Sequence, residues 1–119
     1  MEIITVKIHR DDKLVDGEVK AERIPGKNNF YVWQIRTNKY KAYSLTIIPQ
    51  GGAISYFKYK KDAIELAKVI NDKGFDLDKE FGEIAGDKEF MNFMREYMDN
   101  LNSNSNYIRV GKKINNFPV

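Results

Sequence analysis

Cysteine is absent from this sequence, and histidine occurs once, as His9. The absence of cysteine excludes disulfides, thiolate metal sites and cysteine nucleophiles. It is also typical of proteins in a reducing cytoplasm, so we expect a cytoplasmic location. A metal site built from several histidines is excluded as well, and we interpret His9 as an exposed residue at the end of a strand.

Long apolar runs are missing too. No stretch approaches the roughly 20 apolar residues that a membrane helix needs, so we expect no membrane partner. The first residues, MEIITVKI, alternate apolar and polar side chains as a strand does, and they lack the features of a secretory signal. A chain of 119 residues fits one domain. We predict a single domain over residues 1–101, followed over residues 102–119 by a flexible connector, a possible edge strand at Tyr107–Val110 and a tail.

Catalytic and phosphate-binding motifs are scarce. The glycine patterns GxxxxGK[ST] and GxGxxG do not occur. The segment Asp16–Lys20 contains Glu-x-Lys, which matches part of a metal-dependent nuclease pattern, but we interpret it as a solvated hairpin. The segment Asp72–Glu83 has the length of a calcium loop but lacks a ligand at its third position and glycine at its sixth. We therefore expect no metal, no cofactor and no enzymatic activity, with a nuclease-like enzyme as the least favoured alternative.

Charge is distributed very unevenly along the chain. Residues 23–61 contain eight Lys or Arg and no Asp or Glu, whereas residues 62–101 contain five Lys or Arg and eleven Asp or Glu. The basic stretch also holds eight of the fifteen aromatic residues. Lysine and arginine attract phosphates, and flat rings can stack on bases, so this combination favours nucleic acid as a partner. The alternative is that the rings are core residues of strands, in which aromatics are common.

The rings that motivate the nucleic-acid hypothesis are Trp33, Tyr40, Tyr43 and Tyr59. We expect the contacts themselves at hairpin ends and strand faces, where cations and rings adjoin. The predicted binding residues are Arg36, Lys39, Tyr40, Lys41, Lys58, Tyr59, Lys60 and Lys61.

Alternating patterns and turn residues predict the architecture. An antiparallel sheet of four to five strands in the N-terminal half should pack against two to three helices in the C-terminal half, an α+β class. The predicted strands are residues 2–8, 17–24, 30–36, 40–48 and 53–59. In the third strand we assign Tyr31, Trp33 and Ile35 to the core. In the fourth strand we assign Tyr43, Leu45 and Ile47 to the same core. The intervening residues, Phe30, Val32, Ala42, Ser44 and Thr46 among them, should face outward.

Three helices are expected after the sheet. Apolar residues at helical spacing predict a helix over residues 61–73, with Gly74 just beyond its C-terminus. A short helix should end near Ala85, and Asp87 should cap a third helix through Leu101. The broad apolar face of this Phe90–Leu101 helix is expected to pack on the sheet. A homodimer through that face is the alternative, since its methionines can adapt to a partner.

The run SYFKYKKDAIELAKVI is similar in periodicity and charge to the strand, basic turn and helix that end small three-stranded-sheet modules. The DNA-binding arm domains of phage-type integrases are such modules. The resemblance extends over Phe30–Gly74 and involves no specific motif. It implies contact between DNA and a sheet face.

Two functions remain open at this point. The first is a small non-enzymatic binding protein that uses its basic, aromatic-rich sheet to bind nucleic acid or a nucleic-acid-processing protein. The second is an inhibitor of the kind made by phages or mobile elements, anti-CRISPR-like, which acts by protein–protein contact through the opposite charges of its two halves.

Overall fold

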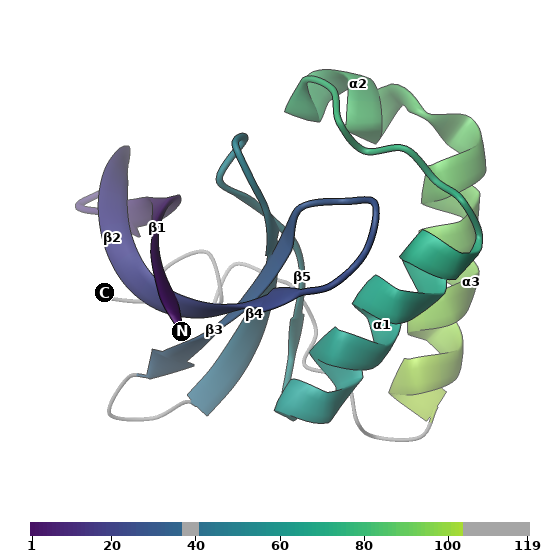
Figure 1. Ribbon diagram of the computed structural model, residues 1–119, viewed down its shortest axis with the longest axis horizontal. Coiled ribbons are helices and arrows are strands. Elements are labelled where there is room, and N and C mark those ends of the chain that lie inside the picture. The colour runs from purple at the N-terminus through teal and green to yellow at the C-terminus, as the bar shows by residue number, and fades with distance from the viewer. Residues whose placement is uncertain (37–40, 104–119) are drawn as a thin grey trace.

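The computed structural model of the protein describes residues 1–36 and 41–103. Within these ranges an antiparallel sheet in the N-terminal half is followed by helices, which confirms the predicted α+β class (Figure 1). The elements are β1 (Glu2–Arg10), β2 (Lys13–Ile24), β3 (Phe30–Arg36), β4 (Lys41–Ile47), β5 (Gly52–Phe57), α1 (Lys60–Asp72), α2 (Phe81–Gly86) and α3 (Lys88–Ser103). The possible strand Tyr107–Val110 and the tail lie outside the described residues.

The sheet is a meander in which each strand pairs with the next, in the order β1-β2-β3-β4-β5. The β1–β2 turn is tight, because Asp11 and Asp12 both have positive φ, 51° and 61°, as a two-residue type I′ turn requires. Strand β2 is longer than the sequence predicted and is divided between two partners. It pairs with β1 up to Ala21 and with β3 over Glu22–Ile24. The β1–β2 hairpin can therefore turn out of the plane of the other strands, as Figure 1 shows.

Both faces of β3 and β4 are buried, because each face is covered by a different part of the chain. One core lies between the sheet and the helices, and it contains Phe30, Val32 and Leu45. The other lies under the β1–β2 hairpin, whose inward residues include Val6 and Ile8. The hairpin is held over this second core by β1, where the Lys7 N–H donates to the Gly51 carbonyl in the β4–β5 turn at 3.1 Å.

The predicted core and outward faces of β3 and β4 were wrong, because both faces of these strands are buried. The register pairs Val32 with Leu45 and Trp33 with Ser44, so the two sets assigned to one core lie on opposite faces. Phe30 and Val32 were expected outside and instead face the helices. Ala42, Ser44 and Thr46 were also expected outside and are buried under the hairpin. Alternation identifies the two faces of a strand but cannot reveal that distant residues cover the second one.

The helical layer follows the local signals of the sequence. Helix α1 buries Ala63, Leu66, Ala67 and Ile70 against the sheet. It ends before Gly74, whose φ of +80° is the left-handed conformation expected beyond a helix C-terminus. Asp87 precedes α3 and its carboxylate accepts the Phe90 N–H at 3.1 Å, as predicted for an N-cap. The short helix α2 follows Glu80, which provides no side-chain cap, and in the segment before it the Asp76 carboxylate accepts the Asp78 N–H at 3.0 Å.

Candidate nucleic-acid interface

One end of the sheet gathers the predicted cations. Arg36 at the end of β3 is the register partner of Lys41 at the start of β4, and both side chains are exposed. In the next pair of strands Tyr43 is opposite Phe57. Because these strands are antiparallel, Lys41, two residues before Tyr43, and Tyr59, two residues after Phe57, lie at the same end of the sheet. Figure 1 shows the end of β3, the start of β4 and the start of α1 together at the lower end of the molecule. Lys39 and Tyr40 lie outside the described residues.

Among the described residues, Tyr59 provides an exposed ring at this end. It is the residue before α1, its side chain makes no capping hydrogen bond, and it is 42% exposed. The Nζ atoms of Lys58 and Lys61 lie 5.5 and 5.6 Å from the centre of its ring. Both distances are within the range of cation–π attraction, which holds the two ammonium groups close to one accessible aromatic surface.

Neutralisation of these cations is limited in the described ranges. Lys60 pairs with Glu22 at 3.0 Å, and no other predicted cation in the described part of the chain has an ion pair. Both partners of that pair are about two-fifths exposed, at 41% and 43%, so the pair contributes little stability. Arg36, Lys41 and Lys61 therefore keep their charge available to an anionic partner.

Carboxylates adjoin this basic end on its helical side. Burial raises the pKa of the Tyr97 hydroxyl, and the nearby charges of Glu65 and Asp62 raise that pKa further. Tyr97 lies on α3, so the carboxylates of Glu65 and Asp62 lie on the side of α1 that is near α3. The basic surface is consequently bounded by negative charge on the side of α3 and extends over the sheet end.

Most rings of the basic stretch that the structure describes are buried or partly buried, in line with the alternative interpretation. Trp33 is 8% exposed, and its Nε1 donates to Thr46 Oγ1 at 3.0 Å within the second core. Tyr31 is 7% exposed, and burial raises the pKa of its hydroxyl, which the nearby charge of Glu2 and the hydrogen bond to that carboxylate raise further. Tyr43 is partly buried against the helix-side core. The open sheet face on which an integrase-type arm domain would place DNA is thus covered in this protein.

The helix predicted to support a homodimer uses much of its apolar face internally. Phe90 and Met94 are buried in the helix-side core, and Tyr97, Met98 and Leu101 pack against it. Met91 is the exposed apolar residue of this helix within the described residues. The homodimer stays a prediction.

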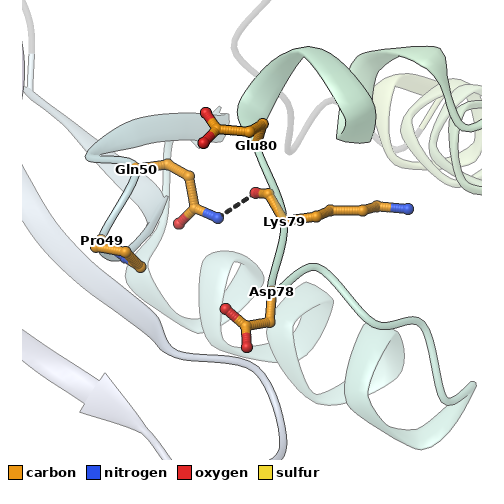
Figure 2. Close-up of a pocket in the computed structure, with 5 residues that line it drawn as sticks. All are labelled: Pro49, Gln50, Asp78, Lys79 and Glu80. Atoms are coloured by element: carbon orange, nitrogen blue, oxygen red, sulfur yellow. Dashed lines mark hydrogen bonds between the residues drawn. The ribbon is translucent and has the colours of Figure 1, made fainter.

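A pocket of about 330 Å³ lies between the β4–β5 turn and the segment before α2. Figure 2 shows Gln50 reaching from the turn toward Lys79, with the carboxylates of Asp78 and Glu80 on either side. The Gln50 amide donates to the carbonyl of Lys79 and, at 3.3 Å, to that of Leu77. These bonds tie the sheet to the helical layer, so we interpret Gln50 as a structural contact.

The described residues contain no group of three or more His, Cys, Asp or Glu side chains placed to hold a metal ion. None of the helices in the described ranges is long and apolar enough to cross a membrane. No family model, no curated protein and no solved structure matches this chain.

Proposed function

We propose that this chain is a small non-enzymatic protein that binds nucleic acid, alone or in a nucleic-acid-processing complex, through the basic end of its sheet. The observation that supports the proposal is that Lys58 and Lys61 flank the exposed ring of Tyr59, and that Arg36 and Lys41 lie as register partners at the same end of the sheet. A cytoplasmic location, expected from the lack of cysteine, belongs to the same proposal.

The arrangement favours flexible single strands over the grooves of a duplex. Both faces of β3 and β4 are covered, so the cations lie along strand ends instead of on a broad platform. An exposed ring beside ammonium groups suits a splayed base, which can stack on Tyr59 while Lys58 and Lys61 contact the adjoining phosphates.

Fluorescence anisotropy with labelled single-stranded DNA, RNA and duplex DNA tests the proposal. Four cations without ion pairs in the described residues, Arg36, Lys41, Lys58 and Lys61, would neutralise about four phosphates, giving a slope of about −3 in log K against log salt for single strands. Raising the salt fourfold should then weaken binding about 60-fold. The double variant Lys58→Glu/Lys61→Glu should lower this slope by about 1 to 2 and weaken binding at low salt by about tenfold or more.

A matched control carries the same change of charge elsewhere. Lys68 and Lys88 are exposed residues of the helical layer, so Lys68→Glu/Lys88→Glu should change affinity much less. Tyr59→Leu should weaken single-strand binding about five- to 150-fold, the range of one lost base stack. Absence of binding to all three nucleic acids at low salt, or equal losses in the two charge variants, would reject the proposal.

A further inference from the structure

A second surface of opposite character lies at the other end of α1. A groove of about 510 Å³ separates the end of this helix from α3, and its lining residues are Lys73, Gly74, Phe75, Glu89, Asn92, Phe93 and Glu96. Helix α1 has 13 residues, so about 20 Å of helix separates the groove from the basic end. Figure 1 shows α3 running alongside α1 over this distance.

The floor of the groove is aromatic. The ring centres of Phe75 and Phe93 are 5.3 Å apart, and the ring centre of Phe93 is 5.8 Å from that of Tyr97 on the next turn of α3. Phe93 is only partly buried. Its ring attracts a cation within the chain itself, because Lys73 Nζ lies 5.6 Å from the centre of the ring. The groove therefore already accommodates a positive charge on an aromatic surface.

The rim of the groove is acidic at both ends. Glu89 and Glu96 are exposed, and they lie four residues before and three residues after Phe93. On a helix these spacings place both carboxylates beside the Phe93 ring. The surrounding segment, residues 62–101, has an excess of six acids over bases, which disfavours a nucleic-acid ligand here.

We propose that this groove binds an arginine side chain from a basic segment of a partner protein. A guanidinium group stacks on aromatic rings and forms paired hydrogen bonds with carboxylates, so it uses both features of the groove. In the bound state it lies over Phe93 between Glu89 and Glu96, and it displaces the ammonium group of Lys73. The site is independent of the basic end, and its occupant is a protein.

Nuclear magnetic resonance titration of the ¹⁵N-labelled full chain tests this assignment. The probe is the peptide Gly-Gly-Arg-Gly-Arg-Gly-Gly, and its counterpart with citrulline keeps the shape of arginine but removes the charge. The arginine peptide should shift the resonances of residues 73–75 and 89–96, and the citrulline peptide should leave them in place. Glu89→Gln/Glu96→Gln should weaken binding about tenfold, whereas Lys73→Ala should strengthen it about threefold by freeing the ring.

The controls separate this site from general attraction to acids. Glu18 and Glu80 are exposed and lie outside the groove, so Glu18→Gln/Glu80→Gln should leave the affinity unchanged. Phe93→Leu should abolish binding, and the fluorescence of Trp33 reports whether that variant is folded. If that variant is not folded, the affinities of the variants at Lys73 and at the two rim glutamates test the proposal in its place. Equal binding of both peptides, equal losses in the two glutamate variants, or no shift at millimolar peptide would overturn the proposal.

Discussion

Replacing Asn28 with alanine should lower the free energy of unfolding by about 3–6 kcal/mol. Asn28 follows β2 and is only 3% exposed. Its Nδ2 donates to Asn71 Oδ1 at 2.9 Å and to the Phe75 carbonyl at 2.8 Å, while its Oδ1 accepts the Leu77 N–H at 2.8 Å. One side chain thus joins the sheet to the end of α1 and to the segment that follows it.

The expected magnitude follows from these contacts. Each of the three side-chain hydrogen bonds contributes about 1 kcal/mol net, which sets the lower value. Leu77 is fully buried, so its N–H would lose its partner where water has little access. A buried donor without a partner adds a desolvation cost of about 1–3 kcal/mol, which sets the upper value. Because a domain of this size is typically stable by about 5–15 kcal/mol, the variant should retain only a narrow margin.

Urea denaturation followed by tryptophan fluorescence measures the effect, since Trp33 is the sole tryptophan and is buried. Asn28→Asp is the informative companion. It keeps an oxygen for the Leu77 N–H but places a carboxylate against the Phe75 carbonyl, so we expect a comparable loss. Asn100→Ala, at an exposed position of α3, should change stability by about 0.5 kcal/mol or less. A loss below about 1 kcal/mol for Asn28→Ala would refute the reasoning, because water would then replace these bonds without cost.

Two further predictions concern the second core and the cap of α3. Ile8→Ala under the hairpin and Ile47→Ala on the helix side should each cost about 2–5 kcal/mol in urea denaturation; a negligible cost at Ile8 would mean that the hairpin does not enclose a core. The pKa of Asp87 is lowered, chiefly by the backbone N–H of Phe90 and next by Lys79. The ionised Asp87 carboxylate therefore stabilises the folded protein above pH 3.8, which is the ordinary pKa of an aspartate. This stabilisation disappears as the pH falls through the lower pKa that Asp87 has in the folded state. The melting temperature of Asp87→Asn should be below that of the parent at pH 6 and converge on it below pH 3.8, and a constant difference would contradict this cause.

The candidate interface could be predicted only in part. Cations next to turns are exposed in most folds, which is why Arg36, Lys41, Lys58 and Lys61 were correctly expected at the surface. The pairing of Lys60 with Glu22 joins residues 38 positions apart and has no local signal. The cation-binding ring of Phe93 was hidden for the same reason, because its partner Lys73 is distant in sequence and lies just beyond the end of α1.

Local sequence was sufficient to predict the short-range features of the fold. The strand and helix segments, the left-handed residue at Gly74 and the cap at Asp87 depend on backbone conformations and contacts within a few residues, so their signals lie side by side in the chain. Long-range packing, in contrast, places the β1–β2 hairpin over β3 and β4, which buries Trp33 and gives the sheet two cores. The same packing brings Asn28 into contact with Asn71 and Phe75. Such contacts depend on which distant surfaces remain uncovered after local structure has formed, and the alternation within a single strand contains no information about that.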